Sequence, residues 1–229
     1  VDLNFLENII IKDNPKVLIL VSVLGLVPDM DKIVELCDKH GVILLEDTCE
    51  SIGSSYHGQN LGTFGLMSSF STYFGHHFST IEGGVVCTND NDTYNILKSL
   101  RSHGWDRDTD EHYKNKLRKD YFVSDDFDSL YKFYMMGFNL RSTDLNAFIG
   151  LNQLKSFDSV IQKRNQNYNL YHKLITCADW KPHESSQDRF VSNFAYPMIS
   201  RNRRKMVDNL TANDVVTRPL ICGSLGKQP

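Results

Sequence analysis

The sequence lacks the features that mark membrane, exported and nucleic-acid-binding proteins. It has no apolar run long enough to span a bilayer and no signal-peptide pattern, which argues against a membrane or exported protein. The 25 basic and 28 acidic residues are interspersed and give a net charge of -3. That balance excludes the basic surface that binds nucleic acids or anionic membranes.

Paired cysteines are also missing. The five cysteines are an odd number, and they are scattered without a CxxC pair: Cys37, Cys49, Cys87, Cys177 and Cys222. They are typical of reduced thiols and form neither a disulfide framework nor a zinc site. We therefore expect a cytoplasmic protein.

Two common phosphate-binding motifs are absent as well. The sequence contains neither GxGxxG nor the Walker pattern, so its glycine pairs are interpreted as devices of the backbone. Lysine is missing from the whole stretch between Lys39 and Lys98.

The hydrophobic pattern predicts an α/β fold. With 229 residues, 41% of them hydrophobic, the chain can bury a large core. Residues 17–24 are apolar on both faces and suit a central parallel strand. Asp29 can cap a helix over residues 30–40, and residues 41–47 form a second strand. This order predicts a parallel βαβ crossover.

The remaining elements are predicted from period and flanking residues. We expect helices at 1–14, 90–102 and 145–174, and strands at 67–74 and 85–88. Residues 109–132 show no clean period, which predicts a long functional or interface loop. A strand at 190–199 and a helix at 201–213 are expected in a second domain.

Residues 44–89 carry the candidate chemistry. One apolar strand ends at Asp47, and the next leads into His76 and His77. The pair Gly83 and Gly84 then allows a tight turn into another strand. Because ligands bind where the strands of an α/β sheet end, this pattern suits a phosphorylated, nitrogen-containing cofactor.

The same stretch resembles the DegT-type family of PLP-dependent sugar aminotransferases, which have PLP fold type I. The matching motifs follow in the family's order without a gap: Glu46-Asp47, Gly62-Thr63-Phe64-Gly65, Phe70-Ser71-Thr72 and Glu82-Gly83-Gly84. The resemblance implies a large domain with a mostly parallel sheet flanked by helices, followed by the start of a small α+β C-terminal domain. It assigns 1–175, including a long linking helix, to the large domain and 176–229 to the small one, in a fragment lacking both ends.

Two departures from the family are informative. His76 stands where the family has its Schiff-base lysine, and an imidazole cannot form the imine that a primary amine forms. Glu50 replaces a glutamine. Both changes are similar to those of the family's deoxygenating branch, the GDP-4-keto-6-deoxymannose 3-dehydratase type and its CDP-sugar 3-dehydrase relatives.

The resemblance implies an activity with its cofactor and partners. The cofactor would be pyridoxal 5'-phosphate, alternating with pyridoxamine 5'-phosphate, and glutamate would be the amino donor. The substrate would be a nucleotide-linked 4-keto-6-deoxy sugar that loses its C3 hydroxyl as water. A homodimer is implied, and the need for a partner reductase stays open, as do the nucleotide and the sugar.

The resemblance also assigns roles to the cofactor-binding residues. Asp47 would place its carboxylate beside the pyridine nitrogen and keep it protonated. Ser71 would hydrogen-bond the phosphate, and Asn139 would reach the phosphate of the other subunit. The competing interpretations are a capping or surface acid for Asp47 and an ordinary strand hydroxyl for Ser71.

Three further residues are assigned to catalysis or substrate. His76 would move protons between the cofactor's C4' and the C3 hydroxyl, although a lone histidine is more often packed or exposed. Glu50 would lie near the cofactor's 3'-oxygen or orient His76; a solvated helix acid is the alternative. Arg218 would lie near substrate, unless it is simply exposed. His77, pointing the other way on an extended backbone, is predicted to be structural.

Other functions remain open from the sequence. One is a sugar aminotransferase that uses a lysine elsewhere, and another is a non-catalytic scaffold that retains the fold. A metal hydrolase built on His76 and His77 is disfavoured, because no third ligand lies at motif spacing.

Overall fold

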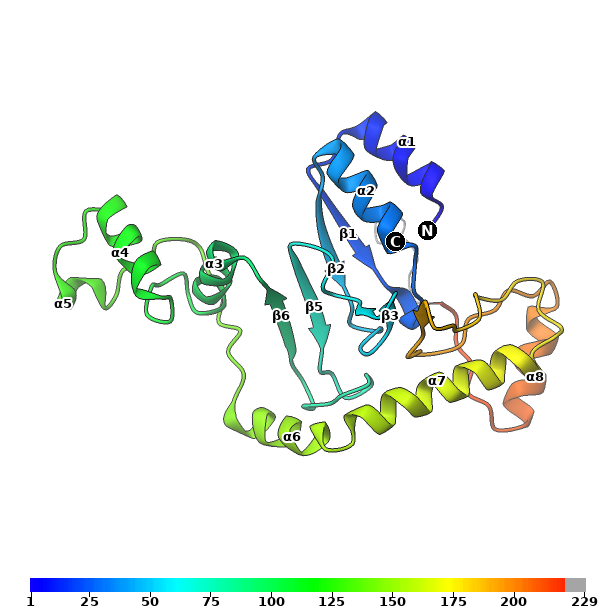
Figure 1. The fold of residues 1–229 in the computed structure, drawn as a ribbon. Helices are drawn as coiled ribbons and strands as arrows, with labels where there is room; N and C mark the ends of the chain where they lie inside the picture. Colours follow the sequence, from blue (N-terminus) through cyan, green and yellow to red (C-terminus); the bar gives the residue numbers. More distant parts are fainter. Residues whose placement is uncertain (221–229) are drawn as a thin grey trace.

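The computed structural model describes residues 1–220 and contains a four-stranded sheet (Figure 1). Its strands are β1 (Val17–Val21), β2 (Ile43–Asp47), β5 (Met67–Ser71) and β6 (Gly84–Thr88), in the order β1-β2-β5-β6. The first three are parallel, and β6 runs antiparallel to β5. The register pairs Val21 with Asp47 and Asp47 with Ser69, so these strands end side by side. The predicted α/β fold with a mostly parallel sheet is confirmed.

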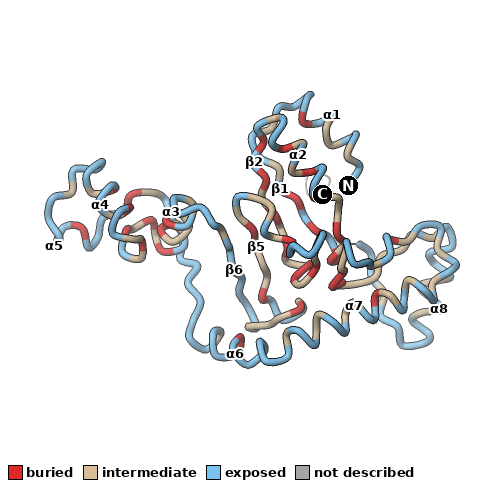
Figure 2. Tube along the Cα trace, viewed as in Figure 1, coloured by how far each residue is buried: buried red, intermediate tan, exposed pale blue. Residues whose placement is uncertain are grey.

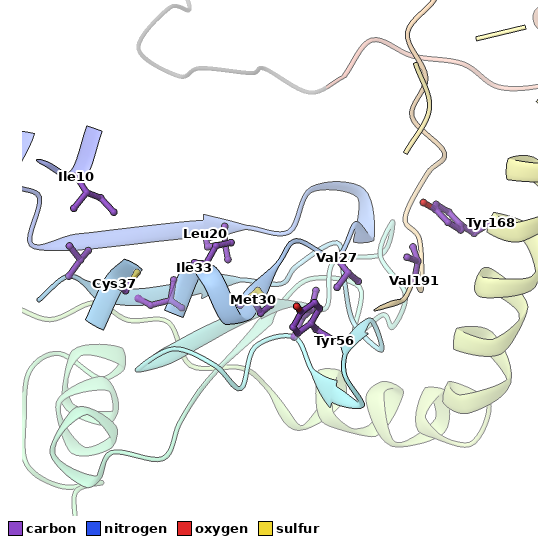
Figure 3. Packing of buried hydrophobic residues seen from close by; sticks show 12 residues of the cluster. Ile10, Leu20, Val27, Met30, Ile33, Cys37, Tyr56, Tyr168 and Val191 are labelled. Atoms are coloured by element: carbon purple, nitrogen blue, oxygen red, sulfur yellow. The ribbon is translucent and has the colours of Figure 1, made fainter. Parts of the chain in front are cut away.

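Two helices, α1 (Leu3–Asp13) and α2 (Met30–His40), cover one face of this sheet. The predicted bounds of α2 are confirmed: Asp29 caps it through Lys32 N, and Gly41 ends it in a left-handed conformation. Figure 3 shows the main core, which begins between these layers and extends to later segments that carry Tyr56, Tyr168 and Val191. Its buried members are Ile10, Leu20, Val27, Met30, Ile33, Cys37, Val42, Leu44, Tyr56, Leu61, Tyr168 and Val191.

The other face of β1 is exposed (Figure 2). Ile19 is 64% exposed, and Val17 and Val21 are also exposed. In residues 1–220, β1 is an edge strand, so the prediction of a central strand is wrong for this part of the chain. The helices α1 and α2 cover only the face of β1 that carries Leu18 and Leu20, so the apolar side chains on its other face stay exposed.

The expected loop at 109–132 contains two helices, α4 (Glu111–Asp120) and α5 (Asp126–Ser129), which follow α3 (Asn91–Arg101). Asp110 caps α4 by accepting a hydrogen bond from Tyr113 N. Tyr113 and Leu117 then pack with Tyr134 in a separate small core. The apolar stripe is only two residues long and lies among charges, which is why its helical period is weak in the sequence.

Two helices also replace the single one expected at 145–174. These are α6 (Asp144–Leu154) and α7 (Phe157–Leu174), which run past the carboxyl end of β5 (Figure 1). A capping box between Thr143 and Asn146 begins α6. Ser156, with ψ of 4°, interrupts the helical path before α7. No helix among residues 1–220 is long and apolar enough to cross a membrane.

The expected strand at 190–199 is mostly irregular. Only β7 (Arg189–Phe190) is a strand, and it joins β3 (Ser55–Tyr56) and β4 (Gln59–Asn60) in a small antiparallel sheet. Val191, which follows β7, packs into the main core. The predicted helix at 201–213 is present as α8 (Arg203–Ala212). The division of the chain at residue 175 stays a prediction.

A short 3₁₀ turn, η1 (Val23–Gly25), connects β1 to the loop before α2 and lies against the later segment. A Cβ on Gly25 would sit 2.5 Å from the Ser192 carbonyl oxygen and 2.8 Å from the Cα of Asn193. Gly41, also left-handed, has nothing within 4 Å of that position. Close backbone approach, rather than φ alone, therefore requires glycine at position 25.

Gly25→Ala should therefore destabilise the protein more than Gly41→Ala. Both variants carry the cost of a left-handed alanine, but only the first forces two backbone segments apart. We expect an additional loss of about 2 kcal/mol in the free energy of unfolding, measured with urea. Equal losses for the two variants would contradict the contact between η1 and residues 192–193.

Candidate functional site

The main chain of Cys49 connects Asp47 to His76. The Cys49 N–H donates to Asp47 Oδ1 at 3.1 Å, and its carbonyl oxygen lies 2.6 Å from His76 Nδ1. Because a carbonyl only accepts, Nδ1 carries a proton, and in the neutral ring His76 Nε2 keeps its lone pair. Asp47 and the imidazole of His76 therefore form one hydrogen-bonded unit at the end of β2.

His76 lies in the loop at 72–83, which connects β5 to the antiparallel β6. The Thr72 and Thr80 hydroxyls are 2.6 Å apart, and Thr80 N donates to Thr72 O at 2.8 Å. From α6, Asn146 Nδ2 donates to Thr80 O at 2.7 Å. The loop is thus closed on itself and attached to the helix beside it.

The two acids that end β2 have different tasks. Glu46 is 3% exposed, and its carboxylate accepts hydrogen bonds from the main-chain nitrogens of Gly62 (2.7 Å), Phe64 (2.7 Å) and Gly65 (2.8 Å). It fixes the glycine-containing turn, while Asp47 lies at the site. One half of the Glu46-Asp47 motif is therefore structural.

The expectation that Glu50 orients His76 is not met in the structure. Glu50 Oε2 instead accepts a hydrogen bond from Leu24 N at 2.7 Å, in the turn where Leu24 has a left-handed φ of 58°. Among residues 1–220, Glu50 and His76 share no hydrogen bond, and the Cys49 carbonyl takes the orienting contact. A main-chain acceptor of this kind leaves no mark in a sequence.

His77 is buried, as the prediction of a structural residue requires. Its Nε2 lies 2.9 Å from the Ser192 carbonyl oxygen, while Nδ1 has no partner among the described residues. Burial, reinforced by the positive charge of Arg164, lowers the pKa of His77 to about 4. The ring is therefore neutral at physiological pH and donates through Nε2.

The aromatic ring of Phe194 joins two of the predicted residues. Its centroid is 5.2 Å from that of the His76 imidazole, and the Arg218 guanidinium carbon lies 5.3 Å from it. Arg218 and His76 thus share the Phe194 ring as a neighbour, and the Arg218 side chain is exposed. Phe194 was missed from the sequence because its segment was interpreted as a strand of another domain.

Ser71 and Asn139 are placed differently. Ser71 ends β5 two residues beyond Ser69, which is paired with Asp47, and accepts a hydrogen bond from Tyr73 N at 3.2 Å. Asn139 is exposed, forms an isolated bridge with Ser102, and accepts from Arg141 Nε at 3.2 Å. Among residues 1–220, Asn139 shares no hydrogen bond with His76 or Asp47.

The polar side chains at this edge of the sheet fit a pyridine ring bearing a phosphate. Asp47 supplies a carboxylate, and Ser69 and Ser71, two residues apart on β5, place their hydroxyls on one face. His76 adds an imidazole base at a position without a lysine. Residues 1–220 contain no group of three side chains that could hold a metal ion.

Because His77 is buried and neutral, we expect the free energy of unfolding to fall in acid. Its pKa of about 4 lies below the ordinary 6.5, so between these values the unfolded chain binds a proton that the native protein does not. Stability is therefore full above the ordinary pKa and falls as pH drops toward 4, by about 3 kcal/mol in the limit. Arg164 and His76 are the charged and titratable neighbours that oppose protonation of His77.

This pH dependence is measured as the difference between wild type and His77→Gln. Urea unfolding of both proteins is measured at neutral pH and near the His77 pKa. Carboxylates that titrate in this pH range contribute equally to both proteins, so their contribution cancels in the difference. The stability advantage of the wild type should shrink toward acid. Parallel stability curves for the two proteins would contradict the neutral assignment.

Comparisons with known proteins agree with this geometry. The model of the DegT/DnrJ/EryC1/StrS aminotransferase family matches residues 1–229. The GDP-4-keto-6-deoxy-D-mannose 3-dehydratase of Yersinia pseudotuberculosis is 32% identical over 233 residues, which cover 99% of this chain and 58% of the relative. The chain thus spans a little over half the length of that enzyme.

Solved structures extend the similarity to the fold. An E. coli GDP-4-keto-6-deoxy-D-mannose-3-dehydratase with bound hydrated PLP has a TM-score of 0.84 and 31% identity over 99% of this chain and 58% of its own. A GDP-4-keto-6-deoxymannose-3-dehydratase with a trapped PLP-glutamate geminal diamine has a TM-score of 0.83 and 30% identity, covering 99% of this chain and 59% of its own. With its fold, motifs and full-length family match in agreement, the chain belongs to the DegT/DnrJ/EryC1/StrS aminotransferase family.

Proposed function

We propose that the protein is a PLP-dependent enzyme that removes the C3 hydroxyl of a nucleotide-linked 4-keto-6-deoxyhexose, with His76 as its base. The observation that carries this proposal is the hydrogen bond between His76 Nδ1 and the Cys49 carbonyl. It orients an imidazole at the position where an aminotransferase needs a lysine. The similarity to 3-dehydratases, one of which holds hydrated PLP, supports it.

Asp47 and Ser71 would hold the cofactor. When bound, PLP supplies an electron sink for the carbons next to its imine nitrogen. The Asp47 carboxylate favours a protonated pyridine nitrogen, and its position is fixed by Cys49 N. Ser71 would donate its hydroxyl to the phosphate.

His76 would move the protons. Its Nε2 would accept one proton at the cofactor's C4' and would deliver one to the C3 hydroxyl of the substrate, which would leave as water. An imidazole exchanges protons readily near neutral pH, so one ring can serve both steps. Glu50 would support this region through Leu24 rather than act on His76 directly.

The partners of the reaction belong to the same proposal. Glutamate would convert the cofactor to its amino form, as the dehydratase that holds PLP and glutamate suggests. Arg218 would offer its exposed cation to the anionic substrate. Asn139, which is exposed and shares no hydrogen bond with His76 among residues 1–220, would reach the site of a second subunit in a homodimer in the cytoplasm. The requirement for a reductase follows only if the product needs further reduction.

Borohydride reduction followed by intact-mass measurement tests the proposal. After incubation with PLP, the protein should bind the cofactor but carry no pyridoxyl adduct, because His76 cannot form an imine. Glutamate should convert the absorption of bound PLP to that of the amino form. His76→Lys is the positive control, since it restores a primary amine at the position and should gain the adduct.

Two other results identify the alternatives. An adduct on a native lysine would overturn the histidine mechanism and indicate a sugar aminotransferase, the activity for which the family is named. Absence of PLP binding would indicate a scaffold that retains the fold without the chemistry.

A further inference from the structure

Residues 192–194 form a short irregular segment, here called the support segment, that carries Phe194 to the site. It follows β7 and is attached to four parts of the chain. Ser192 N donates to Ser54 Oγ at 2.9 Å, and Phe194 N donates to Leu24 O at 2.9 Å. Arg164 Nη1, from α7, donates to Asn193 O at 2.9 Å.

His77 makes the fourth attachment. Its Nε2 donates to the Ser192 carbonyl oxygen at 2.9 Å, and the two residues are 5% and 0% exposed. The other hydrogen bond to that oxygen, from Ser54 Oγ, is longer at 3.4 Å. Without His77, the buried Ser192 carbonyl would depend on this weaker contact.

The support segment gives His76 its second restraint. The Cys49 carbonyl holds Nδ1 at one edge of the imidazole. The Phe194 ring packs against the imidazole with an interplanar angle of 59°. A hydrogen bond at a single atom still lets the ring swing about that contact, whereas a packed aromatic ring limits the swing.

We propose that His77 is a positioning residue for His76, which it serves by holding the Ser192 carbonyl and thereby keeping Phe194 against the catalytic imidazole. The two adjacent histidines thus have different roles: His76 exchanges protons, and His77 fixes the Phe194 ring against which His76 packs. The catalytic consequence rests on the proposed function, whereas the geometry does not.

The buried environment of His77 suits this role. Its ring stays neutral when a more exposed imidazole would be protonated, because burial and Arg164 both oppose a charge there. The donor at Nε2 therefore persists while His76 gains and loses protons. The hydrogen bond from His77 to Ser192 therefore persists in both protonation states of His76.

Three substitutions separate positioning from simple packing. His77→Leu fills the space without a donor. His77→Gln places an amide N–H near the position of Nε2 and should restore the contact with Ser192. Phe194→Leu removes the aromatic ring while leaving His77 in place.

The readout is the NMR signal of the His76 ring in the cofactor-free protein, assigned by its disappearance in His76→Asn. In the wild type, the Phe194 ring should shift the His76 ring protons. His77→Leu should move these signals toward their positions in Phe194→Leu, and His77→Gln should keep them near the wild type. In the loaded enzyme, His77→Leu should lower kcat by about tenfold to a hundredfold with KM unchanged.

The results decide the inference independently of the reaction. Unchanged His76 signals in His77→Leu, while Phe194→Leu moves them, would overturn it. So would a His77→Gln variant that behaves like His77→Leu. If His77→Leu fails to fold, His77→Asn replaces it, because its shorter amide cannot reach Ser192, and the same comparison with His77→Gln applies. Failure of PLP to bind the wild type would overturn the proposed function and leave this NMR result valid.

Discussion

His76→Asn is expected to lower turnover by about 10²- to 10⁴-fold while leaving PLP affinity nearly unchanged. The asparagine amide nitrogen occupies roughly the place of Nδ1, so it can still donate to the Cys49 carbonyl. What it removes is the basic nitrogen at Nε2. The expected loss is therefore in proton transfer alone, and it is measured as kcat together with a PLP titration.

A matched substitution at another histidine controls for this variant. His57 is 53% exposed in its side chain, and the proposed mechanism assigns it no role. His57→Asn should leave turnover at the wild-type level. Turnover of His76→Asn within a few-fold of the wild type would show that the proton passes through another group.

Glu46→Gln is expected to destabilise the protein strongly, although the substitution is conservative. The Glu46 carboxylate is buried and accepts three main-chain hydrogen bonds, from Gly62, Phe64 and Gly65. The glutamine side chain has only one acceptor oxygen, and its NH₂ group would face at least one of these main-chain N–H donors. We expect a loss of about 2–4 kcal/mol in the free energy of unfolding, because a buried N–H loses its partner.

The control for charge removal is Glu35→Gln, at an exposed position of α2. Its unfolding free energy should stay within about 0.5 kcal/mol of the wild type, as is usual at the surface. Urea unfolding monitored by circular dichroism measures both variants. Equal stabilities would mean that the turn at 62–65 holds without Glu46.

Local sequence signals predicted much of the fold. The cap at Asp29 and the stripe of α2 set that helix correctly, and the apolar runs located β1, β2, β5 and β6. The motifs then identified the family. These signals work because capping and periodicity involve neighbours along the chain.

Long-range contacts explain what the sequence could not predict. Residues 190–199 were expected to form a strand, yet they are mostly irregular: Val191 packs in the main core and Phe194 lies against His76. Glu50 has a carboxylate that could orient a base, but this carboxylate accepts a hydrogen bond from Leu24 N. The contact that does orient His76 comes from a main-chain carbonyl, which every residue type possesses.

The distance along the chain between His77 and Ser192 has a consequence for assembly. The loop that carries His76 is a hairpin connection between adjacent strands, so it can close soon after β6 is synthesised. Its support segment is 115 residues further along. During translation, the loop that carries His76 is therefore synthesised well before residues 192–194, which supply its aromatic neighbour. A nascent or truncated chain that ends before residues 192–194 would hold the His76 imidazole without the Phe194 ring beside it.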